Sequence, residues 1–206
     1  MSKQLDRLLK DIRACRVCRD DAEAGKVLPH EPRPVFQISS SARICIAGQA
    51  PGTRVHESGV PFTDPSGDRL REWMGVSDEQ FYDASRIAII PMGFCFPGLD
   101  AKGGDLPPRK ECPKVWRMRL FELLPNIDLM LLIGGYAQSW HMGSAKAKTL
   151  TETVRNWDAG TLKTQRPAFI PLPHPSWRNN AWLKKNAWFE ETVLPVVKRE
   201  VRARLK

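Results

Sequence analysis

Residues 44–52 read Ile-Cys-Ile-Ala-Gly-Gln-Ala-Pro-Gly, a short apolar run that ends in a loop of glycine and proline. A continuous apolar run of this length predicts a buried β-strand, and the glycines and proline predict the turn after it. The pattern returns near the end of the sequence, where the apolar run 168–172 leads into Pro173-His174-Pro175-Ser176. Ligands of open α/β sheets bind in the crevice beyond the carboxyl ends of the strands. The two loops therefore predict two walls of one ligand site.

Four apolar runs alternate with amphipathic segments along the chain. Strands are predicted at 43–47, 86–91, 128–134 and 168–172. Helices are predicted at 2–14, 67–75 (with Ser66 as the N-cap), 113–124, 136–141, 149–156 and 186–204, and loops at 20–41 and 97–113. Such alternation is typical of a parallel sheet with helices on both faces. We predict an α/β fold, a three-layer αβα sandwich around a central, mostly parallel four-stranded sheet, in a single domain over residues 1–206.

The chain is basic, with a formal net charge of +9. An excess of positive charge favours polyanionic partners, of which nucleic acid is the commonest. Basic residues follow both loops, namely Arg54, Arg69 and Arg71 after the first and Arg178, Lys184 and Lys185 after the second. Their positions predict contacts with a phosphate backbone beside the ligand site.

Two sequence features bear on localisation. No stretch approaches the roughly 18 consecutive apolar residues of a membrane span. The first residues, Met1-Ser2-Lys3-Gln4-Leu5-Asp6, lack the apolar core of a signal peptide. We expect a cytoplasmic protein that has no membrane partner and acts as a monomer.

Four of the five cysteines suggest a metal site. Cys45 lies inside the first strand, where a small buried hydrophobe is the simplest interpretation. Cys15, Cys18, Cys95 and Cys112 form two loop pairs. Four thiolates suit a [4Fe–4S] cluster or a tetrahedral zinc ion, and their spacing does not choose between the two.

Other interpretations of these cysteines stay open. His30 could replace one cysteine as a zinc ligand, and buried cysteines without any metal are the third possibility. Disulfides are not expected in a reducing cytoplasm. A metal would tie the N-terminal segment, about 1–40, and the loop 95–112 to the sheet, since loops of this length need something to order them.

The order of the motifs resembles the uracil-DNA glycosylase superfamily, most closely its iron–sulfur branch, family 4. The matching elements are Cys15-x-x-Cys18, Gly48-Gln-Ala-Pro-Gly52, Gly59-Val-Pro-Phe62, Cys95, Cys112, Ile133-Gly134 and His174-Pro175-Ser176. They run from about residue 5 to 190. The resemblance implies a monofunctional DNA glycosylase of base-excision repair, which hydrolyses the N-glycosidic bond of uracil or a related deaminated base flipped out of DNA. It also favours the [4Fe–4S] cluster over zinc or no metal.

Departures from the family pattern mark a divergent member. Gln49 stands where family 4 has a glutamate, and Pro91 stands where family members carry the asparagine that reads the uracil edge. The stretch His174-Pro-Ser-Trp-Arg-Asn179 is instead similar to the single-strand-selective branch. Another base, such as hypoxanthine, xanthine or a damaged pyrimidine, is therefore an alternative substrate.

The resemblance implies a role for each site residue. Phe62 would stack on the flipped base, and neutral His174 would donate a hydrogen bond to the departing base. Asp64 is the predicted water activator, with Asp68 as the runner-up and Gln49 in an orienting role. Gly48, Ala50 and Pro91 complete the base pocket. The predicted DNA contacts are Pro51, Gly52, Ser176 on a flanking phosphate, Trp177 stacked on a neighbouring base, and Arg178 as the wedge.

Two functions of other classes compete with the glycosylase. The first is a non-catalytic nucleic-acid-binding module that retains the glycosylase fold. The second is a metal-stabilised nucleotide-binding domain unrelated to DNA. Replacement of Asp64 by alanine distinguishes the glycosylase from the binding module, because it would abolish catalysis but leave nucleic-acid binding unchanged.

Overall fold

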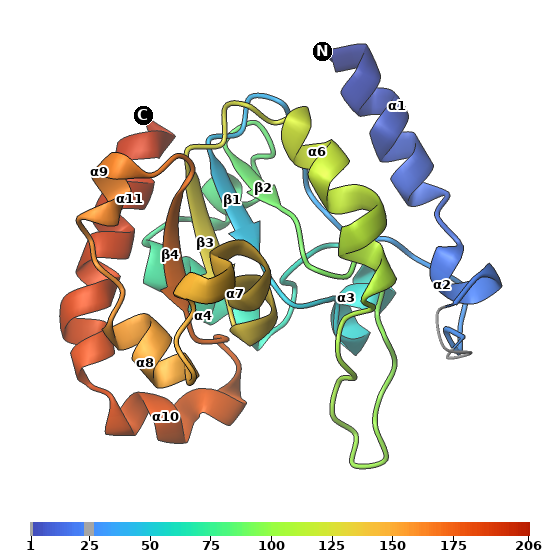
Figure 1. Cartoon of the computed structure of the whole chain (residues 1–206). Coiled ribbons are helices and arrows are strands. Elements are labelled where there is room, and N and C mark those ends of the chain that lie inside the picture. The colour runs from blue at the N-terminus through green and yellow to red at the C-terminus, as the bar shows by residue number, and fades with distance from the viewer. Residues whose placement is uncertain (1, 23–26) are drawn as a thin grey trace.

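A four-stranded parallel sheet forms the centre of the computed structural model, which describes residues 2–22 and 27–206 (Figure 1). The strands are β1 (Ile44–Ala47), β2 (Ile87–Ile89), β3 (Leu129–Ile133) and β4 (Ala168–Leu172). Their order across the sheet is β2-β1-β3-β4, and every neighbouring pair is parallel. The predicted α/β class and its four strands are confirmed.

Helices cover both faces of the sheet because the strands are apolar on both sides. Side chains alternate along β1, so that Ile44 and Ile46 join one core and Cys45 and Ala47 join the other. The first core includes residues of α4 (Pro65–Met74) and α11 (Leu194–Leu205). The second includes residues of α1 (Ser2–Arg13), α6 (Met118–Glu122) and α7 (Gly135–Met142). The predicted three layers are therefore present (Figure 1).

The longer predicted helices are confirmed with shifted boundaries. The predicted helix 113–124 begins as a π-helical turn, η2 (Pro113–Arg117), before α6, and the predicted helix 186–204 begins as η5 (Phe189–Val193) before α11. The helix predicted over 149–156 is α8 (Leu150–Arg155). The remaining helices, all short, were not predicted: α2 (Val17–Asp20), α3 (Thr53–Ser58), α5 (Asp78–Phe81), α9 (Thr161–Thr164), α10 (Asn180–Lys185), and the 3-10 turns η3 (Gly143–Ala145) and η4 (Trp177–Asn179).

One predicted helix start is wrong. Ser66 was expected to cap the helix at 67–75, but α4 begins at Pro65 and Asp64 is its N-cap. The Asp64 carboxylate accepts a hydrogen bond from the Gly67 N–H at 3.3 Å. Proline is favoured in the first helical turn because it needs no N–H partner there, and Ser66 is buried one position further on.

The predicted loops join these elements. Of the loop 20–41, residues 27–41 are irregular apart from a bridge between Gln37 and Ile89, and residues 23–26 lie outside the described chain. The loop after β2 extends away from the sheet, and a bridge between Leu99 and Asp105 closes its tip (Figure 1).

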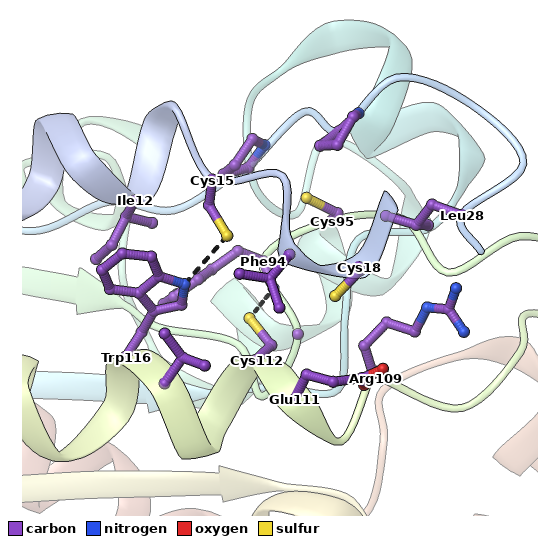
Figure 2. Close-up of a pocket in the computed structure, with 15 residues that line it drawn as sticks. Ile12, Cys15, Cys18, Leu28, Phe94, Cys95, Arg109, Glu111, Cys112 and Trp116 are labelled. Atoms are coloured by element: carbon purple, nitrogen blue, oxygen red, sulfur yellow. Dashed lines mark hydrogen bonds between the residues drawn. The ribbon is translucent and has the colours of Figure 1, made fainter. Parts of the chain in front are cut away.

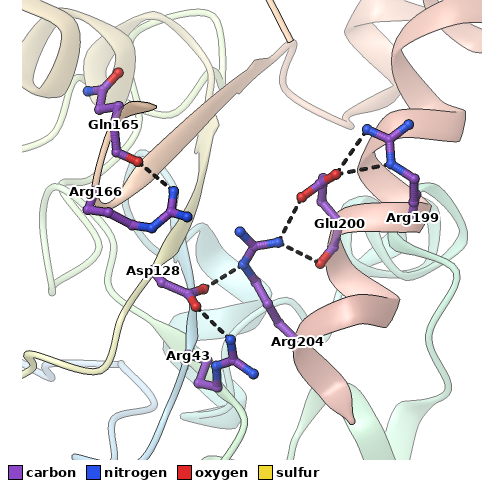
Figure 3. A network of polar contacts seen from close by, with 7 residues as sticks. All are labelled: Arg43, Asp128, Gln165, Arg166, Arg199, Glu200 and Arg204. Atoms are coloured by element: carbon purple, nitrogen blue, oxygen red, sulfur yellow. Dashed lines mark hydrogen bonds and ion pairs between the residues drawn. The ribbon is translucent and has the colours of Figure 1, made fainter. Parts of the chain in front are cut away.

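Ion pairs fasten α11 to the amino ends of the strands (Figure 3). Asp128, just before β3, accepts from Arg204 of α11 and from Arg43, which precedes β1, at 2.7 Å in the latter pair. Arg204 also pairs with Glu200 one turn earlier, at 2.8 Å. The Arg204 side chain is only 9% exposed, so its own contacts are shielded from solvent, whereas the Arg43 side chain is 48% exposed.

No helix in the described chain is long and apolar enough to cross a membrane.

Candidate active site

A cavity of about 710 Å³ opens at the carboxyl edge of the sheet. Its walls come from the loops that follow β1, β2 and β4 and from the start of α4. Apart from the runner-up Asp68, every residue predicted for catalysis, base binding or the close DNA contacts lines it: Gly48, Gln49, Ala50, Pro51, Gly52, Phe62, Asp64, Pro91, His174, Ser176, Trp177 and Arg178. The structure thus brings these residues together, while their individual roles stay predictions.

Backbone hydrogen bonds fix the first loop against the segment after β2. The Met92 N–H donates to the Gly48 carbonyl, and the Gly93 N–H donates to the Gln49 carbonyl, both at 2.9 Å. These bonds continue the pairing of β1 with β2 beyond the strands themselves. The loop is therefore a rigid wall of the cavity.

Phe62 has a strained backbone that its surroundings hold in place. Its φ angle is +56°, in the left-handed region that a phenylalanine rarely adopts. Its carbonyl accepts from the Tyr82 hydroxyl at 3.2 Å and from Arg71 at 3.4 Å. A Cβ atom at Gly67 would lie 1.8 Å from that same oxygen, so only glycine fits there. Strain maintained in this way is typical of functional sites.

The Phe62 ring faces the first loop. A Cβ atom at Gly48 would lie 3.5 Å from the ring tip, and the ring meets Phe81 edge to face at 6.0 Å between centroids. The ring is partly exposed and lines the cavity. An aromatic face is thus available to a planar ligand above Gly48.

His174 is held as a neutral hydrogen-bond donor. Its Nδ1 accepts from the Ser176 N–H at 3.3 Å, so a neutral ring carries its proton on Nε2. Burial lowers the pKa of His174 below its usual 6.5, although the charges of Asp64 and Asp105 oppose that shift. The ring is therefore uncharged at neutral pH.

Side chains of η4 and α4 support the His174 loop. Asn179 donates to the His174 carbonyl at 2.7 Å, and Arg69 of α4 donates to the carbonyls of Pro175 and Ser176 at 3.2 Å. Arg69 was expected to contact phosphate, but its guanidinium is engaged with this loop. Arg71 likewise pairs with Asp68 and Asp78, besides its contact with Phe62.

Two carboxylates line the cavity, and only one was predicted. Asp64 does so from the N-cap of α4, whereas the runner-up Asp68 is 74% exposed and pairs with Arg71 outside the cavity lining. Asp105 comes from the long loop after β2, and a Cβ atom at Gly52 would lie 3.5 Å from its Oδ2. No sequence motif marked Asp105, because its place depends on how that loop folds back.

The four cysteines of the predicted metal site line a second, small cavity of about 20 Å³ (Figure 2). The sulfur atoms of Cys15, Cys18, Cys95 and Cys112 surround one space, with Cys15 and Cys18 from the N-terminal segment and the others from the loop after β2. Trp116 Nε1–H donates to the Cys15 sulfur and the Phe94 N–H donates to the Cys112 sulfur, both at 3.3 Å.

The arrangement of these thiols bears on what they could hold. Within the described residues, no three His, Cys, Asp or Glu side chains lie close enough together to share one metal ion. Four cysteines and N–H donors to their sulfurs are the residue types found at iron–sulfur sites. The predicted cluster itself stays a prediction.

The contacts and burial of His30 and Cys45 bear on the two remaining predictions for these residue types. Both ring nitrogens of His30 lie against backbone carbonyls, those of Glu31 at 2.9 Å and Phe96 at 3.0 Å, so His30 is not placed as a zinc ligand. Cys45 is fully buried in β1, as predicted. All five cysteines are free thiols. Burial raises the pKa of Cys18 to about 11 and that of Cys95 to about 12.

The cavity at the carboxyl edge of the parallel sheet holds a neutral histidine, two carboxylates and a partly exposed aromatic ring, and this edge is where α/β enzymes bind their ligands. A family model described as the uracil DNA glycosylase superfamily matches residues 35–198. The chain belongs to this superfamily. It is accordingly a glycosylase-type enzyme with DNA as its substrate.

Proposed function

We propose that the protein is a monofunctional DNA glycosylase of base-excision repair, which hydrolyses the N-glycosidic bond of uracil or a related deaminated base. The observation that carries this proposal is the meeting of Phe62, Asp64 and His174 in one cavity of about 710 Å³. That volume accommodates a nucleobase together with its sugar.

Base binding comes first. The target nucleotide leaves the duplex stack, at a cost of a few kcal/mol, and its base enters the cavity. The Phe62 ring covers one face of the base while the Gly48–Gln49 backbone and Pro91 line its edge. Pro91 has no side-chain amide that could read this edge of the base. The proposal therefore includes uracil and the other deaminated bases as substrates.

Bond cleavage then needs a donor for the leaving base. As the bond between C1′ and the base nitrogen breaks, both electrons pass to the base, which becomes an anion. The Nε2–H of neutral His174 donates to an oxygen of that anion without giving up its proton. Donors fixed in advance stabilise developing charge because they need no reorganisation.

Water completes the reaction on the sugar. The Asp64 carboxylate orients a water molecule toward C1′ and, through its negative charge, stabilises the oxocarbenium-like cation. The water oxygen adds to C1′ while its proton passes to the Asp64 carboxylate and from there to solvent. The base anion takes up a proton from solvent once it has left the cavity. Asp64 suits the role of water activator because its carboxylate lines the cavity while it caps α4, where the hydrogen bond from the Gly67 N–H at 3.3 Å holds it in place.

The exposed residues at the cavity mouth contact the DNA. Trp177 is 70% exposed and stacks on a neighbouring base, and the Arg178 guanidinium, 5.4 Å from the Trp177 ring centre, fills the space left by the flipped base. Ser176 binds a flanking phosphate. These contacts place the cavity over the target nucleotide.

The four cysteines bind a [4Fe–4S] cluster under this proposal. The cluster would supply iron–thiolate bonds that tie the segment after α1 to the loop after β2, which is a structural contribution. Cys15, Cys18, Cys95 and Cys112 would be its ligands.

The test is release of a base from end-labelled oligonucleotides that carry uracil, hypoxanthine or xanthine, in single and double strands, read by alkali cleavage. Cleavage at one of these bases, strongly slowed by Asp64→Asn and retained by Asp68→Asn, is the expected result. DNA binding without cleavage at any base would overturn the proposal in favour of a non-catalytic binding module.

A further inference from the structure

Arg117 is a buried cation without a carboxylate partner among the described residues. Its side chain extends from the π-helical turn η2, and the residue is 2% exposed. Its Nη1 donates to the carbonyls of Ile90 and Pro91 at 3.2 Å, and its Nε donates to His141 Nε2 at 2.9 Å. Burial lowers the pKa of Arg117 to about 10, so the guanidinium stays charged at neutral pH. Burial of a charged group that contacts only neutral acceptors lowers the stability of the fold, so the burial of Arg117 needs an explanation.

A chain of hydrogen bonds leads from this charge to the cavity. Arg117 donates to the Pro91 carbonyl, and the N–H at the other end of that peptide, on Met92, donates to the Gly48 carbonyl at 2.9 Å. The N–H at the far end of the Gly48 peptide belongs to Gln49, which lines the cavity. Among the backbone hydrogen bonds of the described loops, none engages this Gln49 N–H.

Two properties of such a chain matter for catalysis. In a trans peptide the C=O and the N–H point in opposite directions, so each unit passes the polarisation on. Hydrogen-bond chains in a low-dielectric interior strengthen one another, and a charged donor at the start strengthens the donor at the end. The buried charge therefore makes the N–H of Gln49, a residue that lines the cavity, a better hydrogen-bond donor.

We propose that Arg117 is a positioning residue of the glycosylase reaction. Through the peptides 91–92 and 48–49 it orders the base pocket and favours the negative charge on the departing base. His141, whose Nε2 accepts from the guanidinium, fixes the orientation of Arg117. This inference rests on the proposed function.

A structural role and an electrostatic role predict different dependences on the leaving base. 5-Fluorouracil leaves as a more stable anion than uracil, because fluorine withdraws electron density from the ring. A variant that only disturbs the pocket slows both bases equally. A variant that loses charge stabilisation slows the poorer leaving group, uracil, more.

The experiment measures single-turnover release of uracil and of 5-fluorouracil from matched single-stranded oligonucleotides. Arg117→Met removes the charge and keeps the apolar stem, while Arg117→Lys keeps the charge. Arg119→Met is the matched control, because Arg119 lies exposed two residues further on, over the Trp116 ring. Affinity for an oligonucleotide with an abasic site and the unfolding midpoint are measured for each variant.

We expect Arg117→Met to slow uracil release about 100-fold and 5-fluorouracil release about 10-fold. The preference for 5-fluorouracil thus rises about tenfold, with affinity for the abasic site retained. Arg117→Lys recovers most of the loss, and Arg119→Met stays within about twofold of the parent for both bases. If Arg117→Met does not fold, the preference is measured in Arg117→Lys, where we expect a rise of about threefold because one ammonium replaces several guanidinium contacts.

Equal slowing of both bases by a folded Arg117→Met, or no slowing, would overturn the role of Arg117 and leave the proposed function intact. An unchanged preference in Arg117→Lys, as the fallback variant, would overturn it as well. A parent enzyme that binds both oligonucleotides but releases neither base would overturn the proposed function first. The parent rate therefore separates the two failures.

Discussion

The two ends of the central sheet carry charge in opposite ways. At the amino end, Asp128 is bonded to both Arg43 and Arg204, and the pairs lock α11 to the strands. At the carboxyl end, Asp64 and Asp105 line a cavity beside the neutral His174, and within the described chain no ion pair joins either carboxylate to an opposite charge. Paired charges stabilise the fold, whereas charges held without partners are available to a substrate. The comparison predicts that substitutions at the carboxyl end lower the rate of base release, and that substitutions at the amino end lower the free energy of unfolding.

The largest expected effect is at the carboxyl end. His174→Ala removes the donor to the leaving base, so base release should fall about 100-fold to 1,000-fold. Single-turnover kinetics on the preferred oligonucleotide measure this loss. DNA affinity should change little, and a fall in rate of less than fivefold would remove His174 from the mechanism.

Asp64→Asn separates the two roles of this residue. Asparagine caps a helix as well as aspartate does, so the unfolding midpoint should stay close to that of the parent. Base release should fall about 100-fold, because the amide cannot accept a proton or stabilise a cation. The matched control, Asp68→Asn, lies on the same helix outside the cavity lining and should keep the parent rate. Equal rates for the two variants would contradict the assignment.

As the pH falls, His141 should lower the stability of the protein before the carboxylates at the amino end become protonated. Burial and the Arg117 charge lower the pKa of His141 from 6.5 to about 3. The unfolded chain therefore gains a proton below pH 6.5 that the folded chain does not, and stability falls as pH drops from 6.5 toward 3. At pH 5 the loss is about 2 kcal/mol from this group.

Urea unfolding between pH 7 and pH 5 checks this dependence. His141→Gln keeps an acceptor for Arg117 but does not titrate, so its stability should vary less with pH than that of the parent. Glu200, whose pKa lies below its usual 4.5 despite burial because of Arg204 and Arg199, contributes only at lower pH. Parallel curves for the parent and His141→Gln would show that another group controls the acid limb.

The smallest expected effect is at the amino end. Asp128→Asn weakens its contacts with Arg43 and Arg204 and should lower the free energy of unfolding by about 1–2 kcal/mol. Urea denaturation at pH 7 gives the value. Base release at 25 °C should equal that of the parent, and a slower reaction would mean that the two ends are coupled.

Much of the site could be predicted because of one property of parallel sheets. Loops that follow the carboxyl ends of parallel strands meet at one edge, so Gly48–Gly52 and His174–Arg178 reach the same cavity from opposite parts of the chain. Glycine, proline, histidine and serine marked those loops. The four cysteines were grouped as one candidate site from residue type and spacing, and the structure places them around one small cavity.

Local sequence features were enough to predict the strands, the three layers and the loops of the cavity, because apolar runs and turn residues act locally. Three features became visible only in the folded chain: the strand order β2-β1-β3-β4, the placement of Asp105 and the burial of Arg117. It also decided that Arg69 supports the His174 loop instead of binding phosphate. Each of these features depends on contacts between residues far apart in the sequence. Those contacts form only when the sheet brings the residues together, so no local pattern predicts them.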